Sequence, residues 1–166
     1  LTRILRDENF VLQSLFNKKL KLWCVIGRAL EKPIYASLCR SVVALDPSIR
    51  FTGIANEDGI LVGVSQRKGL KPLLSFEERA QYAITAATRQ YTRLRWEVLL
   101  GKILYASSHY AKLIRATIPI TDDNRRLSYV LLMSFDSNTD NFHEIVIEKV
   151  IPLVKKKRTS LLKASD

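Results

Sequence analysis

The segment from Ser75 to Gly101 is the part of the sequence that most narrows the possible folds. Ser75 is followed three residues later by Glu78, a capping-box pattern in which each side chain accepts a hydrogen bond from the other residue's backbone N–H. Apolar residues then recur every three or four positions until Gly101, which is a typical helix stop. They are Phe76, Ala80, Ala83, Ile84, Ala87, Tyr91, Leu94 and Val98. The pattern predicts a long helix with one apolar face.

Two strands joined by a tight turn are predicted just before this helix. The sequence IRFTGIANEDGILVGVS places apolar runs on both sides of Asn-Glu-Asp-Gly, and Asp-Gly is a strong signal for a hairpin turn. Gly53 and Gly63 lie inside the two strands. A missing side chain within a strand predicts the close approach of a helix at these points.

Three further strands are predicted after the helix, over residues 102–108, 113–120 and 127–135, linked by the sequences SHYAK and TDDNRR. The last strand is apolar on both faces at its centre, which predicts a central strand covered on both sides. Additional helices are predicted over residues 8–31, from Pro33 to the Asp-Pro-Ser sequence at 46–48, and from Asp140 with fraying toward residues 155–158.

Together these elements predict an α+β fold in three layers. Hairpin links imply an antiparallel sheet, so we expect a five-stranded antiparallel sheet between helices, with an extra N-terminal helix. We expect residues 1–32 to be an N-terminal helical extension and residues 33–166 to be a single domain. Because the chain begins at Leu1 and has Met133 as its only methionine, we expect a fragment or a chain without its initiator.

The order of elements from Pro33 to about Val154 resembles the roadblock/LC7 fold, which profilin-like and longin domains broadly share. The sequences ALDPSIRFTGIANEDGILVG, RKGLKPLLS and LIRATIPI are similar to those of a family of small uncharacterised archaeal proteins. The roadblock/LC7 resemblance implies a regulatory or scaffolding domain that forms a homodimer and often serves small GTPases in signalling. It also implies that the strand over residues 102–108 lies at a sheet edge.

The charge of the chain favours an acidic partner. The sequence has 27 Lys and Arg against 16 Asp and Glu, a formal net charge of +11. Such a charge suits nucleic acid, an anionic membrane surface or an acidic protein face. Cys24 and Cys39 lack metal-ligand spacing and are expected to be small buried hydrophobes, which favours a reducing, cytoplasmic location. No apolar run is long enough for a transmembrane helix.

The sequence offers no pattern typical of catalysis. His109 and His143 have no metal-ligand spacing, and Asp122 and Asp123 are adjacent in a turn, where Asp is favoured for backbone reasons. The Ser-Ser-His sequence ending at His109 lacks the glycines and the following helix of a nucleophile elbow. We therefore expect a protein that is not an enzyme and needs neither a metal nor a cofactor.

The connection QRKGLKPLL, between the second strand and the capped helix, has two interpretations. Its glycines are wrongly spaced for a phosphate-binding loop, and Pro72 removes one N–H donor. It can be an ordinary connection with solvated cations, held on the core by Leu70, Leu73 and Leu74. It can also be a docking loop, because loops carry function disproportionately. The binding residues would then be Arg67, Lys68 and Lys71.

A second face of the capped helix carries aromatic and basic residues at three-and-four spacing. They are Tyr82, Thr85, Arg89, Arg93 and Trp96. This face can be a solvated arginine face, a protein interface, or a nucleic-acid surface that binds by stacking and phosphate contacts. We favour a non-enzymatic, homodimeric regulatory module with an interface at Tyr82, Arg89, Arg93 and Trp96, binding a protein partner such as a small GTPase. The alternatives are a basic nucleic-acid-binding domain and a small-molecule sensor domain.

Overall fold

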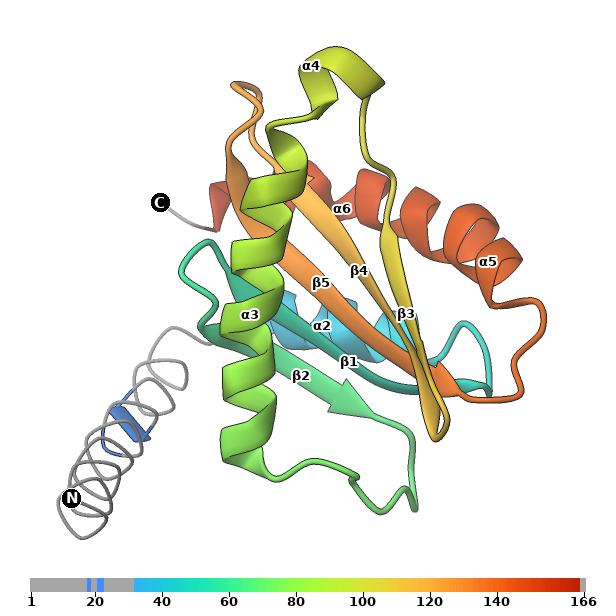
Figure 1. The fold of residues 1–166 in the computed structure, drawn as a ribbon. Coiled ribbons are helices and arrows are strands. Elements are labelled where there is room, and N and C mark those ends of the chain that lie inside the picture. Colours follow the sequence, from blue (N-terminus) through green and yellow to red (C-terminus); the bar gives the residue numbers. More distant parts are fainter. Residues whose placement is uncertain (1–17, 19–20, 23–31, 165–166) are drawn as a thin grey trace, which may run out of the picture.

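The computed structural model describes residues 18, 21–22 and 32–164 (Figure 1). Its elements are α2 (Pro33–Val43), β1 (Ile49–Asn56), β2 (Leu61–Gln66), α3 (Phe76–Leu94), α4 (Glu97–Leu100), β3 (Ala106–Tyr110), β4 (Leu113–Thr121), β5 (Leu127–Asp136), α5 (Phe142–Glu144), the π-helix η1 (Ile145–Val150) and α6 (Ile151–Lys163). Lys18, Lys21 and Leu22 are helical, in agreement with the extra N-terminal helix. The other residues of the predicted helix over 8–31, Cys24 included, lie outside the described residues.

The five strands form one antiparallel sheet with the order β2-β1-β5-β4-β3, which confirms the predicted sheet. β5 is the central strand, and residues 129–135 of it are all buried. A strand covered on both faces must be apolar on both faces, which is why LSYVLLMSF does not alternate. The two edge strands are β2 and β3. The roadblock/LC7 resemblance implied an edge position for β3, and this is confirmed.

Helices cover both faces of the sheet (Figure 1). Along β5, Leu131, Met133 and Phe135 pack in one core with α2, η1 and α6, whereas Val130 and Leu132 pack under α3 in a second core. This alternation follows from the two-residue period of a strand. The three predicted layers are confirmed, with Cys39 of α2 fully buried in the larger core.

Helix α3 begins as predicted but buries a different set of side chains. The backbone N–H of Glu78 donates to Ser75 Oγ (3.2 Å), and the backbone N–H of Ser75 donates to Glu78 Oε2 (2.7 Å). The buried residues are Ala80, Ala83, Ala86, Ala87 and Gln90. The expected stripe is therefore wrong at Phe76, Tyr91 and Val98, which are exposed. Alanines let the helix lie close to the sheet, so larger side chains are left at its margins and beyond its end.

The close approach of a helix is confirmed at one of the two strand glycines. A Cβ at Gly63 would lie 2.7 Å from the Cβ of Tyr35, so α2 rests directly on this part of β2. At Gly53 the nearest atoms belong to the side chains of Phe51 and Leu61, so the predicted helix contact is wrong there. Side chains from the same two strands fill the space above Gly53.

Two predicted boundaries differ from the structure. The strand expected over residues 102–108 is Ala106–Tyr110, and only Ala111 and Lys112 form the turn before β4. With a two-residue turn, strand pairing begins directly next to the turn, so β3 lies closer to the turn than predicted. The last helix does not fray near residues 155–158 but continues to Lys163, because Val154 and Leu161 are buried against the sheet. None of the helices in the described part of the chain is long and apolar enough to cross a membrane.

Candidate interaction surface and adjoining pocket

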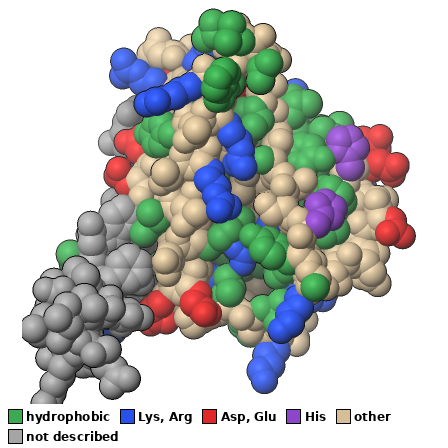
Figure 2. Space-filling view, viewed as in Figure 1, with side chains coloured by type: hydrophobic (Ala, Val, Ile, Leu, Met, Phe, Trp, Pro, Cys, Tyr) green, Lys and Arg blue, Asp and Glu red, His purple; other side chains and the backbone are tan. Residues whose placement is uncertain are grey.

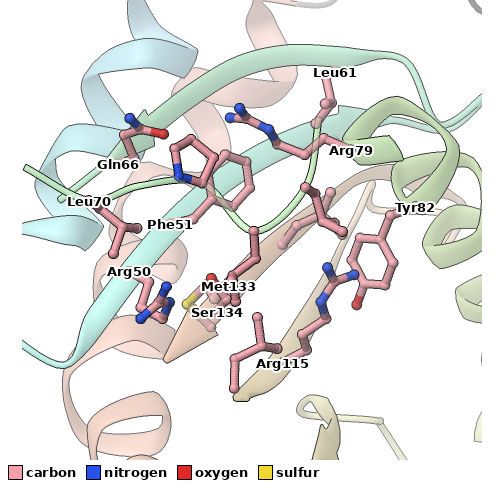
Figure 3. Close-up of a pocket in the computed structure, with 15 residues that line it drawn as sticks. Arg50, Phe51, Leu61, Gln66, Leu70, Arg79, Tyr82, Arg115, Met133 and Ser134 are labelled. Carbon is pink, nitrogen blue, oxygen red and sulfur yellow. The ribbon is translucent and has the colours of Figure 1, made fainter. Parts of the chain in front are cut away.

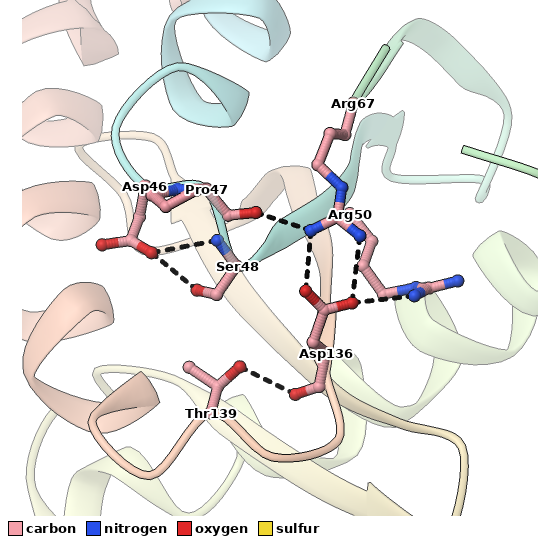
Figure 4. Close-up of polar contacts among 7 residues, drawn as sticks. All are labelled: Asp46, Pro47, Ser48, Arg50, Arg67, Asp136 and Thr139. Carbon is pink, nitrogen blue, oxygen red and sulfur yellow. Dashed lines mark hydrogen bonds and ion pairs between the residues drawn. The ribbon is translucent and has the colours of Figure 1, made fainter. Parts of the chain in front are cut away.

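The connection between β2 and α3 is held to the sheet by an arginine predicted to face solvent. Arg67 Nη1 and Nη2 donate to the two carboxylate oxygens of Asp136, at 2.7 and 3.1 Å (Figure 4). Arg67 Nη1 also donates to the carbonyl oxygen of Pro47 (2.6 Å), and Arg50 Nη1 donates to Asp136 Oδ1 (2.8 Å). Arg67 therefore ties the connection to the start of β1 and the end of β5. Lys68, another of the three predicted binding cations, is exposed.

The third predicted binding cation of this connection, Lys71, is exposed as well. The leucines expected to anchor the connection are only partly covered: Leu70 and Leu74 are half-buried, and Leu73 is exposed. Gly69 has a φ of 72°, as expected for a tight reversal between Lys68 and Leu70. The structure thus separates one structural cation from two that face solvent.

The arginine pair around Asp136 changes the acidity of this carboxyl. Hydrogen bonds from Arg67 lower the pKa of Asp136, burial acts in the opposite direction, and Arg50 lowers it further. The charged carboxylate is therefore the form that the fold stabilises. The same pairing raises the pKa of Arg67, so this ion pair persists at every pH near neutrality.

We expect the lowered pKa of Asp136 to appear in the pH dependence of stability. A carboxyl with a lowered pKa in the fold contributes stability that is fully present above its ordinary pKa of 3.8 and is lost as the pH falls through the lowered value. The free energy of unfolding of Asp136→Asn should therefore fall less steeply below about pH 4 than that of the unaltered protein. Urea unfolding at a series of pH values measures this slope. Asp140→Asn, a change at an exposed carboxylate, is the control. If the free energy of unfolding depends on pH in the same way in both variants, the assignment to Asp136 is contradicted.

The predicted interface residues of α3 lie together beside β3 and β4. Tyr82, Arg89 and Arg93 line a shallow groove between α3 and these strands. The guanidinium of Arg115 in β4 lies 3.6 Å from the ring centroid of Tyr82, a close cation–π contact. Figure 2 shows basic side chains over the C-terminal half of α3. Trp96, the fourth predicted residue, lies past the end of α3 and precedes α4.

The short helix α4 presents an apolar cluster that the sequence analysis missed. Val98, Leu99 and Leu100 are 83%, 76% and 81% exposed, and Trp96 beside them is 56% exposed. Figure 2 shows these hydrophobic side chains gathered at the end of the molecule, above the basic ones. The signal was present in the sequence: three consecutive apolar residues cannot all point to one face of a helix. Exposed apolar side chains in such a group are typical of surfaces that contact another molecule.

An apolar pocket lies at the other end of α3, between the sheet and the β2–α3 connection (Figure 3). Its volume is about 60 Å³, and its surface is mostly apolar. The apolar lining comes from Phe51, Leu61, Leu70, Pro72, Leu73, Leu74, Leu113, Leu132 and Met133, and the polar lining from Arg50, Gln66, Arg79, Arg115, Ser134 and the hydroxyl of Tyr82. These residues come from β1, β2, the β2–α3 connection, α3, β4 and β5, so no local sequence pattern could have predicted the pocket.

The histidines and turn carboxylates of the described residues form no reactive cluster. That part of the chain contains no group of three or more His, Cys, Asp or Glu placed to hold a metal ion. His143 Nδ1 shares a hydrogen bond with the Tyr105 hydroxyl, and the His109 ring packs edge-on against Phe142. Asp122 Oδ1 accepts from the backbone N–H of Arg126 (2.8 Å), which is the turn role expected for it.

No family model matches the sequence, and no curated protein sequence matches it either. Solved structures match the fold. A roadblock/LC7 domain from Streptomyces avermitilis is 14% identical, with 76% of this chain and 97% of that chain covered and a TM-score of 0.58. The gliding protein MglB from Thermus thermophilus is 8% identical, with 78% and 93% covered and a TM-score of 0.59. MglB from Myxococcus xanthus is 15% identical, with 77% and 90% covered and a TM-score of 0.55. The domain described here therefore has the roadblock/LC7 fold.

Proposed function

We propose that this chain is a non-enzymatic regulatory or scaffolding module that acts as a homodimer and binds a protein partner. The observations that carry the proposal are the exposed apolar cluster of α4, formed by Trp96, Val98, Leu99 and Leu100, and the edge strand β3 that follows α4 in the chain. An edge strand offers unpaired backbone N–H and C=O groups to another chain. A second chain that also covered α4 would remove its exposed Trp and Leu side chains from water.

The residues predicted from the sequence fit such an interface. Arg89 and Arg93 lie between the apolar cluster and the Tyr82–Arg115 stack, so two basic side chains lie between aromatic ones along this side of α3. Tyr, Trp and Arg are the residues most enriched among those that dominate binding energy. We propose that a second copy of the chain covers β3 and α4, with the Tyr82–Arg93 face near the twofold axis.

Light scattering at tens of micromolar is expected to give twice the chain mass of 19.0 kDa. We expect Trp96→Ala to weaken dimerisation about tenfold or more, because a buried Trp is a typical hot spot of an interface. Tyr91→Ala is the matched control, since Tyr91 is a half-exposed aromatic of α3, at 48% exposure, outside the proposed interface. A monomer mass for the unaltered protein, or equal effects of the two changes, would refute the proposed interface.

We propose the β2–α3 connection as the docking site for the partner, with Lys68 and Lys71 as the contacting cations. Both are exposed, and Lys68 directly follows Arg67, whose ion pair with Asp136 holds the start of the connection to the sheet. An acidic protein face would complement them. A small GTPase is the partner class that the roadblock/LC7 resemblance implies, and buried Cys39 is compatible with a cytoplasmic location. Recovery of a GTPase by the unaltered protein, and its loss with Lys68→Glu and Lys71→Glu together, tests the assignment.

A basic nucleic-acid-binding domain is the second candidate function, favoured by the formal net charge of +11. The two functions differ in their response to salt. Duplex DNA binding would lose affinity with a log–log slope of roughly 0.9 for each phosphate contact. A salt titration with duplex DNA and single-stranded RNA therefore separates this candidate from a protein-binding module.

A further inference from the structure

The pocket between the sheet and the β2–α3 connection combines an apolar interior with more arginines than nearby carboxylates. Arg50, Arg79 and Arg115 are among its lining residues, and no Asp or Glu is. Arg50 shares the single carboxylate of Asp136 with Arg67. The pocket therefore has an excess of positive charge even after that ion pair is counted.

The side chains of two of these arginines make no hydrogen bond or ion pair with any residue that the structure describes. Arg115 is positioned by the ring of Tyr82, at 3.6 Å from the ring centroid, and Arg79 by the ring of Phe51, at 5.6 Å. The Nε atom of Arg79 is buried without an acceptor. Ring contacts fix the two guanidinium groups while leaving their N–H donors unused, and planar N–H pairs match a carboxylate.

We propose that this pocket binds a small organic carboxylate, with the apolar part of the ligand inside and the carboxylate at one of the two unpaired guanidinium groups, that of Arg79 or that of Arg115 (Figure 3). The ligand needs both parts. A purely polar anion would leave Leu61, Leu132 and Phe51 facing water, and a neutral apolar molecule would leave the arginine donors unpaired.

The size of the pocket limits the ligand. The pocket has a volume of about 60 Å³. By the same measure, one water-sized group needs about 10–15 Å³, so the interior holds about four to six heavy atoms. A short aliphatic chain or a single aromatic ring fits this space, whereas a long acyl chain does not. Hexanoate and benzoate are therefore suitable probes. The pocket shares Tyr82 and Arg115 with the groove of the proposed dimer interface.

Isothermal titration at constant ionic strength tests the proposal with hexanoate, benzoate, hexanamide and acetate. We expect the two apolar carboxylates to bind and to raise the melting temperature. Hexanamide lacks the charge and acetate lacks the apolar part, so each should bind at least about tenfold more weakly. Equal binding of hexanoate and hexanamide would overturn the role of the arginines. Absence of binding by both apolar carboxylates would overturn the site.

Variants assign the binding to this pocket. Arg79→Gln or Arg115→Gln, whichever removes the guanidinium that holds the carboxylate, should weaken hexanoate binding about tenfold, because a charge-assisted hydrogen bond is lost. Arg40→Gln on α2, across the sheet from the pocket, is the control with the same loss of charge. Ser134→Leu, which fills the pocket from β5, should abolish binding while the arginines remain. Hexanoate affinity that survives both Gln variants would refute the assignment.

A carboxylate on a protein partner has the same chemistry as a free acid, and one further titration separates the two. A peptide that ends in Leu-Glu presents an apolar group next to carboxylates. We expect free hexanoate to bind at least as tightly as this peptide, because the pocket holds only a few heavy atoms. Binding of the peptide without binding of hexanoate would assign the pocket to a protein partner and overturn the small-molecule proposal.

Discussion

Gly59→Ala is expected to lower the free energy of unfolding by about 2–5 kcal/mol, from backbone strain and overpacking together. Gly59 closes the hairpin turn with a φ of 79°, a conformation that costs any residue with a Cβ. A Cβ there would also lie 2.5 Å from the Cα and 2.9 Å from the N of Ile84. These are backbone atoms of α3, so the whole helix would have to shift away from the hairpin.

Gly69→Ala separates the two contributions. Gly69 has a similar φ of 72°, but nothing lies within 4 Å of a Cβ built there. Gly69→Ala should therefore lower the free energy of unfolding by only about 1 kcal/mol, from backbone strain alone. Urea unfolding of the two variants gives both values. If the two costs are equal, the contact between the hairpin turn and α3 does not restrict residue 59.

Arg67→Glu is expected to destabilise the fold by about 1–2 kcal/mol, even after allowance for partial exposure of the pair. The change removes both hydrogen bonds to Asp136 and places a second carboxylate beside it. It also removes the donor to the Pro47 carbonyl, so the β2–α3 connection loses its attachment to the end of the sheet. Thermal and urea unfolding measure the effect.

Lys68→Glu is the adjacent control with the same change of charge. Lys68 is exposed and should leave stability within about 0.5 kcal/mol. The pair also separates structure from docking, since partner binding should fall with Lys68→Glu at unchanged stability. An Arg67→Glu protein as stable as the Lys68→Glu protein would show that the Asp136 pair does not hold the connection.

The pocket and the proposed interface share a boundary. Tyr82 and Arg115 line both the pocket and the groove between α3 and β3. Helix α4 follows the C-terminal end of α3 (Figure 1), whereas the pocket is lined by Arg79 and Tyr82 near the N-terminal end of α3. One helix thus carries both candidate sites, and the Tyr82–Arg115 stack separates the pocket from the groove.

Local patterns determined the elements of this protein. Ser75 and Glu78 satisfy each other's backbone N–H groups, and Asp-Gly at 58–59 supplies a turn with positive φ, so both features form from neighbours in the sequence. The apolar run of β5 required a central strand whatever covered it. These constraints act within a few residues, and for that reason the sheet and its helices could be predicted.

Only the tertiary structure decided which side chains are available for function. Arg67 belongs to the fold because Asp136, 69 residues away, lies opposite it, whereas the neighbouring Lys68 is exposed to solvent. Val98 is exposed because α3 ends at Leu94. Arg79 and Arg115 come from different elements and line one pocket. Burial and ion pairing depend on distances between segments remote in sequence, which the local pattern of residues does not contain.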